Sequence, residues 1–157
     1  MTDVAEPAPS ASGSRVVTAA VVYFALVFAV GLVFGPARVF WLEPWLGPAL
    51  AVLCEAPFLI AAMMFSARFA SLLAGLGGRW PARLSMGVLA LIMQQVADLS
   101  IGFGLRGVTL QQQLNYFQTL PGYIYVGMLT LFAAVPLLAR GGSTDPPTTE
   151  TARNTEP

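Results

Sequence analysis

The chain has 157 residues, of which 56% are hydrophobic and 10% charged, with a mean hydropathy of +0.70 and a formal net charge of zero. So few charges exclude an ordinary soluble domain, which carries about 25% charged residues, and the lack of net positive charge argues against a nucleic-acid partner. The sequence contains no histidine, which disfavours haem, His-ligated metal ions and a histidine general base. We therefore expect an integral membrane protein whose surroundings are the lipid bilayer, with no cofactor and no metal site.

The two ends of the chain differ from the rest. Residues 1–14 and 141–157 are rich in Pro, Ser, Thr and Gly and poor in apolar side chains. Such segments bury too little apolar surface to offset the entropy lost on ordering. They are predicted to be disordered tails on either side of a transmembrane domain at 15–140. Acidic residues before Arg15 and the length of the apolar run after it disfavour a cleaved signal peptide.

Four long apolar runs lie between the tails. Each is close to the roughly 20 residues that cross a hydrocarbon core about 30 Å thick, and none has the alternating pattern of a barrel strand. Backbone groups in lipid must be hydrogen-bonded within their own segment, so each run is predicted to be a helix. The predicted spans are 16–34, 45–65, 86–105 and 121–139. The expected fold class is an all-α membrane protein, a bundle of four transmembrane helices.

The basic residues predict how these helices are oriented. All eight are arginine. With four spans, one side of the membrane holds Arg15, Arg68, Arg79, Arg83, Arg140 and Arg153, and the other side holds Arg38 and Arg106. By the positive-inside rule, both termini are then cytoplasmic. We expect a multi-pass protein of a bacterial inner (cytoplasmic) membrane.

The second run contains a glutamate, Glu55, within the central sequence AVLCEAPFL. Insertion scales give a free-energy cost of roughly 2.5 to 3.5 kcal/mol for an ionised side chain at this depth in the membrane. Pro57 lacks an N–H group and its ring crowds the preceding turn, so a kink is expected there. Two interpretations remain open: Glu55 is protonated and holds neighbouring helices together, or it pairs with a charge and has a functional role.

The third run carries further polar side chains. Gln94 and Gln95 lie four and three residues before Asp98, so all three side chains share one helix face, which must turn away from lipid. If Asp98 lies close to Glu55, repulsion between the two carboxylates favours a shared proton. Arginine side chains from the outer side can reach back toward these acids or, alternatively, anchor helix ends among headgroups. We predict one buried polar cluster, formed by Arg38, Glu55, Gln94, Gln95, Asp98 and Arg106.

The segment TLQQQLNYF between the third and fourth runs predicts a short amphipathic helix. Thr109 and Gln112 have the spacing of a capping box, and Leu110, Leu114 and Phe117 fall on one stripe. This helix is expected to lie on the outer membrane surface as a lid over the polar cluster.

The order of several short motifs resembles a group of uncharacterised small four-helix inner-membrane proteins of proteobacteria. The motifs are G-P-x-R at 35–38, P-W-L-G at 44–47, A-V-L-x-E-x-P at 51–57, R-L-x-M-G at 83–87, an acid at 98 and L-R-G at 105–107. The likeness covers roughly residues 31–139. It implies the four-helix form and a constellation of Arg38, Glu55, Asp98 and Arg106, with aspartate at position 98 where the resemblance leads us to expect glutamate.

No catalytic residue is assigned. The chain has no Gly-rich phosphate loop followed by Lys and Ser or Thr and no G-x-S-x-G elbow. The first hypothesis is a non-enzymatic accessory or assembly subunit that acts in a larger membrane complex. The second is a small proton-coupled transporter, working as a homodimer, that uses Glu55 and Asp98. The third is a membrane enzyme acting on lipid or isoprenoid substrates, with the same acids as general acid and base.

Overall fold

A computed structural model describes residues 13–77, 79–105 and 107–139. These residues are helical apart from short turns, and no strand occurs among them. In chain order the elements are α1 (Gly13–Ala37), η1 (Arg38–Leu42), α2 (Glu43–Leu73), α3 (Trp80–Ser100), η2 (Ile101–Leu105), α4 (Leu110–Phe117) and α5 (Leu120–Leu138), where η marks a π-helical segment. The all-helical fold class predicted from composition is confirmed.

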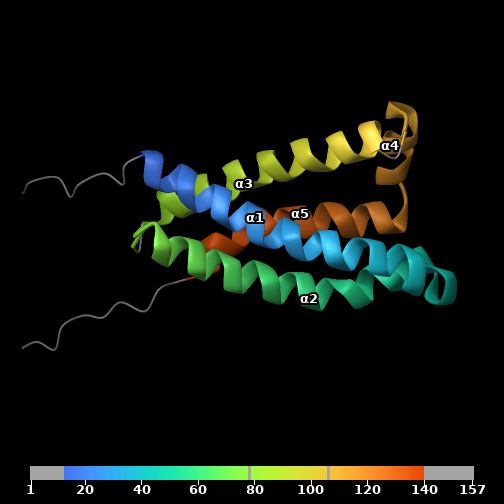
Figure 1. Ribbon diagram of the computed structural model, residues 1–157, viewed down its shortest axis with the longest axis horizontal. Helices are drawn as coiled ribbons and strands as arrows, with labels where there is room; N and C mark the ends of the chain where they lie inside the picture. The colour runs from blue at the N-terminus through green and yellow to red at the C-terminus, as the bar shows by residue number, and fades with distance from the viewer. Residues whose placement is uncertain (1–12, 78, 106, 140–157) are drawn as a thin grey trace, which may run out of the picture.

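The first three elements form a single helical stretch that reverses direction. It covers Gly13–Leu73, 61 residues, and its two halves, α1 and α2, lie side by side (Figure 1). Inside α2, Gly47 has non-helical backbone angles, with φ 76° and ψ 164°. A residue before proline avoids the helical region and glycine adopts positive φ at little cost, so the Gly47–Pro48 step explains this break. Around Pro57, where the sequence predicted a kink, the backbone keeps helical angles.

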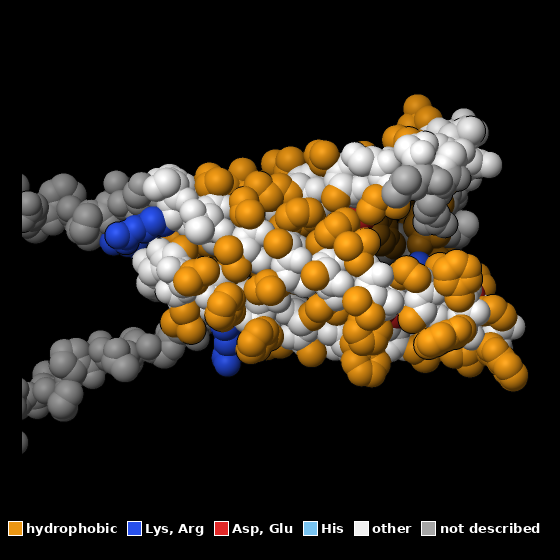
Figure 2. Space-filling view, in the orientation of Figure 1, with side chains coloured by type: hydrophobic (Ala, Val, Ile, Leu, Met, Phe, Trp, Pro, Cys, Tyr) orange, Lys and Arg blue, Asp and Glu red, His pale blue; other side chains and the backbone are white. Residues whose placement is uncertain are grey.

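Three helical stretches are long and apolar enough to cross a membrane. They are Gly13–Leu73, Trp80–Gly104 and Leu120–Leu138. The sequence predicted four spans; the structure has three such stretches because the first two predicted spans are joined in the stretch that reverses direction. Figure 2 shows apolar side chains along the whole length of one face, which is the surface that lipid requires.

The helices are arranged so that α1 and α5 each pack against both α2 and α3. Consequently α2 and α3 lie at opposite corners of the bundle, although they follow one another in the chain. The Tyr23 ring of α1 stacks on Phe132 of α5, with centroids 4.6 Å apart, and the Tyr23 hydroxyl donates to the Phe132 carbonyl at 2.8 Å. This contact joins α1 to α5, the helices at the other two corners, across the centre of the bundle.

The hydrophobic core occupies one end of the bundle. We call the end that holds Gly13, the turn after α2 and Ala139 the inner end, and the end that holds η1, η2 and α4 the outer end (Figure 1). Much of the core is small residues, whose side chains let helix backbones approach closely. Its buried members are Val16, Ala19, Ala20, Tyr23, Val27, Met63, Ala67, Ala70, Leu76, Met86, Ala90, Phe132, Val135 and Ala139. In the outer half, the buried residues that the structure describes are Ala51, Glu55 and Gly122.

The predicted tails are mostly outside the described residues. Gly13 and Ser14, which were assigned to the first tail, belong to α1. The rest of 1–14 and the whole of 141–157 lie beyond the described ranges.

Candidate functional site

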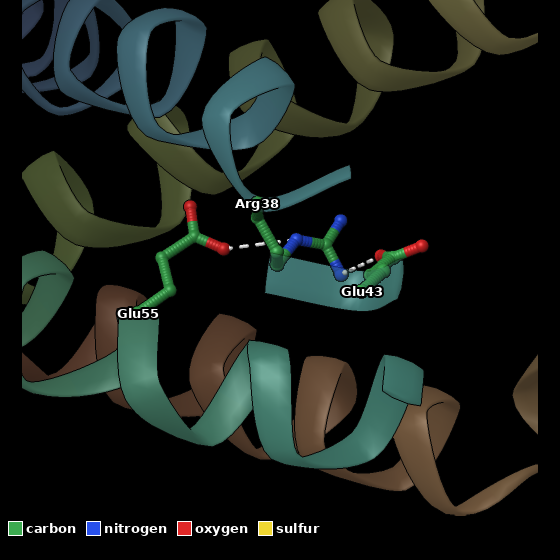
Figure 3. Close-up of polar contacts among 3 residues, drawn as sticks. All are labelled: Arg38, Glu43 and Glu55. Carbon is green, nitrogen blue, oxygen red and sulfur yellow. Dashed lines mark ion pairs between the residues drawn. The ribbon is translucent and has the colours of Figure 1, made fainter. Parts of the chain in front are cut away.

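Arg38 lies between two carboxylates near the outer end. Its Nη1 is 3.1 Å from Glu43 Oε1, and its Nε is 3.0 Å from Glu55 Oε2 (Figure 3). The Glu55 side chain is 9% exposed, whereas those of Arg38 and Glu43 are 22% and 28% exposed. We call Arg38, Glu43 and Glu55 the Arg38 triad. It places one guanidinium charge beside a buried carboxyl group and a half-buried one.

The local sequence explains how Arg38 reaches this position. Pro36 sits in the last turn of α1, where it removes a backbone N–H and disturbs the helical hydrogen bonding. The chain continues as the π-helical segment η1, which begins at Arg38 and leads directly into Glu43. Short π-helical segments frequently occur at functional sites. The chain reverses after η1, at the non-helical Gly47, and this brings Arg38 opposite Glu55 of α2.

The contact between Arg38 and Glu55 is an ion pair without hydrogen-bond geometry. The Arg38 Nε atom is buried and its N–H does not point at an acceptor among the described residues, despite the 3.0 Å separation from Glu55 Oε2. Its Coulomb attraction remains, because that depends on distance and on the polarity of the surroundings.

A second polar group lies between α3 and α5. Gln94 Nε2 donates to Asp98 Oδ1 at 2.9 Å. The Tyr125 hydroxyl lies 2.7 Å from Asp98 Oδ2 and 3.1 Å from Gln95 Oε1. We call Gln94, Gln95, Asp98 and Tyr125 the Asp98 cluster. Its members are all half-buried, and Gln94 Oε1 is a buried atom without a hydrogen-bond partner.

The helix α4 covers the Asp98 cluster from the outer end. The rings of Tyr116 and Phe117 lie 6.3 Å and 6.2 Å from the ring of Tyr125, measured between centroids. The predicted capping box at Thr109 and Gln112 is present. A Cβ on Gly122 would meet the backbone of Tyr116 and Phe117, so α4 is packed closely against the start of α5. The helix α4 therefore forms a closely packed cover over Tyr125.

The six residues predicted to form one cluster are divided by the fold. Arg38 and Glu55 are together in one hairpin, and Gln94, Gln95 and Asp98 are together in the other. No described contact joins Glu55 to Asp98, whose helices occupy opposite corners of the bundle. Arg106 lies outside the described residues.

The two acids nevertheless lie at similar depth. Near the inner end, Ser71 Oγ of α2 is 3.7 Å from Met86 Sδ of α3. Counted along each helix from that contact, Glu55 is four residues further away than Asp98. At a rise of about 1.5 Å per residue, the two differ in depth by roughly 6 Å.

Three residues that make polar contacts in the structure were not predicted as site residues from the sequence: Glu43, Tyr125 and Arg83. Glu43 follows Arg38 by five residues, a spacing that faces the same side in a π-helix but not in an α-helix, whose neighbours are three or four residues apart. Tyr125 lies in an apolar run, and nothing local distinguishes its hydroxyl from one that faces a headgroup. Arg83 was counted only for orientation, yet it is 5% exposed.

Arg83 fastens the inner end through backbone carbonyl groups. Its Nε and Nη2 donate to the Gly77 carbonyl at 3.0 Å and 2.7 Å, and its Nη1 donates to the Ala139 carbonyl. A guanidinium with its donors in a fixed plane suits this arrangement. The turn after α2 and the end of α5 are thereby held together.

The chemistry available at these sites is that of ion pairs and hydrogen bonds. Within 13–77, 79–105 and 107–139, no group of three His, Cys, Asp or Glu side chains is close enough to hold a metal ion. Cys54 is exposed and unpaired.

Comparison of the chain with protein families, with curated proteins and with solved structures finds no match.

Proposed function

We propose that the chain is a four-span protein of a bacterial inner membrane, with both termini on the cytoplasmic side. The reversal at Gly47 supports this, because the helical segments before and after it, 13–46 and 48–73, are each long enough to span. The arginine distribution gives the orientation: described Arg15, Arg68, Arg79 and Arg83 belong to the inner end, and Arg38 belongs to the outer end.

We further propose that it acts as a non-catalytic accessory or assembly subunit of a larger membrane complex. One observation carries this: the bundle has a hydrophobic core in its inner half and almost none in its outer half. The outer elements η1, η2 and α4 have main packing contacts only with elements of their own hairpin. Figure 2 shows the surface hollowed between α4 and the turn that joins α1 to α2. A membrane helix of a partner would supply the missing contacts.

Site-specific photo-crosslinking tests this function. A photo-reactive amino acid replaces Leu99 of outer α3, which is 38% exposed, or Leu72 of inner α2, which is 75% exposed. In membranes of the native host, the probe at 99 should crosslink to one defined protein that co-purifies at fixed stoichiometry in mild detergent. The probe at 72 is the matched control and should crosslink to lipid. A lone, monodisperse chain with no protein crosslink from position 99 would contradict the proposal.

A proton-coupled carrier is the second candidate. It is favoured by the contrast between an inner end, where Arg83 joins the turn after α2 to the end of α5, and an outer end, where the surface is hollowed between α4 and the turn that joins α1 to α2 (Figure 2). Alternating access requires a site that opens to one side at a time. Glu55→Gln should then abolish proton-coupled flux in proteoliposomes while the protein stays folded. Normal flux in this variant would remove the carrier hypothesis.

A further inference from the structure

The inner half of α2 has an apolar stripe on its outward face. Phe65, Phe69 and Leu72 have the spacing of neighbours on one helix face, and they are 70%, 46% and 75% exposed. The rings of Phe65 and Phe69 stack, with centroids 6.3 Å apart. The opposite face of this part of α2 is buried in the bundle core through Ala67 and Ala70. We call Phe65, Phe69 and Leu72 the α2 stripe; its exposure makes it a surface for lipid.

Arg68 lies within the α2 stripe. It follows Phe65 by three residues and precedes Leu72 by four, so it shares their helix face, and it is exposed. Figure 2 shows basic side chains at the surface of the inner half, among apolar ones. A positive charge therefore projects from a surface that is otherwise suited to hydrocarbon.

The depth of Arg68 distinguishes it from an arginine at a helix end. The helix α2 continues for five residues after Arg68, to Leu73. At about 1.5 Å per residue, the Arg68 backbone lies roughly 7.5 Å below the end of the helix. Leu72 and Leu73 lie in this interval and are 75% and 62% exposed. Because these leucines also require an apolar surrounding, Arg68 leaves the helix inside the apolar layer and not at its edge.

A guanidinium that starts at this depth is stabilised by a counter-charge. A cation in hydrocarbon is costly, and the long arginine stem lets the charged end rise toward the headgroups. Within 13–77, 79–105 and 107–139 the acids are Glu43, Glu55 and Asp98, which all belong to the outer half. The phosphate group of a lipid is at the right level, and its oxygens match the fork of guanidinium donors.

We infer that the inner end of α2 is a binding site for an anionic phospholipid of the adjoining leaflet. Arg68 binds the lipid phosphate, and Phe65 and Phe69 contact an acyl chain. Arg15 of α1 adds positive potential, because its Nη1 would be 3.9 Å from a Cβ on Gly75, in the turn after α2. The charge of Arg68 within an apolar stripe selects this occupant, which is itself a charge on an apolar body. The site rests on the four-span arrangement proposed above and not on the subunit function.

Lipid titration followed by native mass spectrometry tests the site. Phosphatidylglycerol, which is anionic, and phosphatidylcholine with the same acyl chains are added in equal amounts to the full chain in mild detergent. The full chain is used so that the acids of 1–12 and 140–157 compete for Arg68 as they do in the protein. The wild-type chain should retain phosphatidylglycerol in preference to phosphatidylcholine. Equal retention of the two lipids would overturn the proposal, whether or not any variant folds.

Two arginine variants test the position of the charge. Arg68→Gln should weaken phosphatidylglycerol binding by about tenfold, as expected for the loss of one charge-assisted hydrogen bond. Arg79→Gln is the matched control, because it removes the same charge from an exposed arginine of the inner end that precedes α3 and lies outside the stripe. It should change binding by less than about twofold. Equal losses in the two variants would show a diffuse attraction to the inner end and would overturn the Arg68 site.

A phenylalanine variant and a phosphate competition test the apolar part. Phe65→Ala should weaken binding by about threefold or more, because it removes apolar contact with the acyl chain. Phe40→Ala, at a position that is 75% exposed near the outer end, should leave binding unchanged. Excess inorganic phosphate should not displace the lipid; displacement would assign Arg68 to a free anion and overturn the lipid site. The crosslinking at position 99 reports on the outer end, so failure of the subunit function and failure of the lipid site are distinguishable.

Discussion

At the residue scale, Arg38 is the partner that makes a buried Glu55 tolerable. Replacing a whole buried ion pair by apolar residues is often nearly neutral, but removing one partner leaves an uncompensated charge. The sequence predicted Arg38 beside Glu55, because one acid near the membrane centre requires a nearby donor. It did not predict Glu43 as the third member, because 35–44 lies between two predicted spans and the π-helical turn that brings Glu43 to Arg38 has no local sequence pattern.

Substitution of Arg38 should therefore be costly. We expect Arg38→Gln to lower the free energy of unfolding by about 3 kcal/mol, because Glu55 loses its cation. Thermal and denaturant unfolding in detergent measures this. Glu43→Gln is the control: its pair with Arg38 is more exposed, so the loss should be below about 1 kcal/mol. Equal effects of the two variants would show that Glu55 does not depend on Arg38.

At the element scale, the inner half is held by close backbone approach. A Cβ on Gly87 of α3 would lie 3.1 Å from the Ala133 carbonyl carbon of α5 and closer still to its oxygen. Such an approach is possible only without a side chain. The sequence predicted these helices from hydrophobicity alone, but it could not identify which glycine faces a neighbour. Gly31 and Gly35, a GxxxG pair in α1, have open space around them.

Alanine substitution distinguishes these two kinds of glycine. We expect Gly87→Ala to destabilise the protein by about 1 to 3 kcal/mol, because α3 and α5 must move apart. Gly127→Ala of α5 is the matched control, since a Cβ there meets nothing within 4 Å, and it should be neutral or raise stability by up to about 1 kcal/mol. The melting temperatures of both variants in the same detergent test this. A stable Gly87→Ala variant would contradict the observed α3–α5 packing.

At the scale of the whole molecule, two helical hairpins share a hydrophobic core at the inner end, whereas few of the described residues in the outer half are buried. Each hairpin carries one polar group, the Arg38 triad or the Asp98 cluster. The order of helices around the bundle causes this division, because α2 and α3 lie at opposite corners with α1 and α5 between them.

Cysteine accessibility tests the four-span arrangement. In a Cys54→Ala background, Trp45→Cys and Trp80→Cys place single thiols at positions that are 88% and 67% exposed, at the outer and inner ends. With four spans, a membrane-impermeant thiol reagent should label them from opposite sides of oriented vesicles. Labelling of both from the same side would exclude that topology. In the double variant Trp45→Cys/Trp80→Cys, the thiol at position 80 should be labelled from the same side as in the single variant Trp80→Cys. This comparison checks that Trp45→Cys leaves the orientation unchanged.

The sequence by itself determined the all-helical class, the apolar segments long enough to cross a membrane and the residues that cannot face lipid. These follow from local rules: a run of about 20 apolar residues must be helical in a bilayer, and Glu55 or Asp98 within such a run must find a polar partner. Only the tertiary structure decided which partner each acid has. Helix neighbours are set by small-residue packing among distant segments, so the separation of Glu55 from Asp98, and the contact of Tyr125 with Asp98, depend on a helix order that no local pattern encodes.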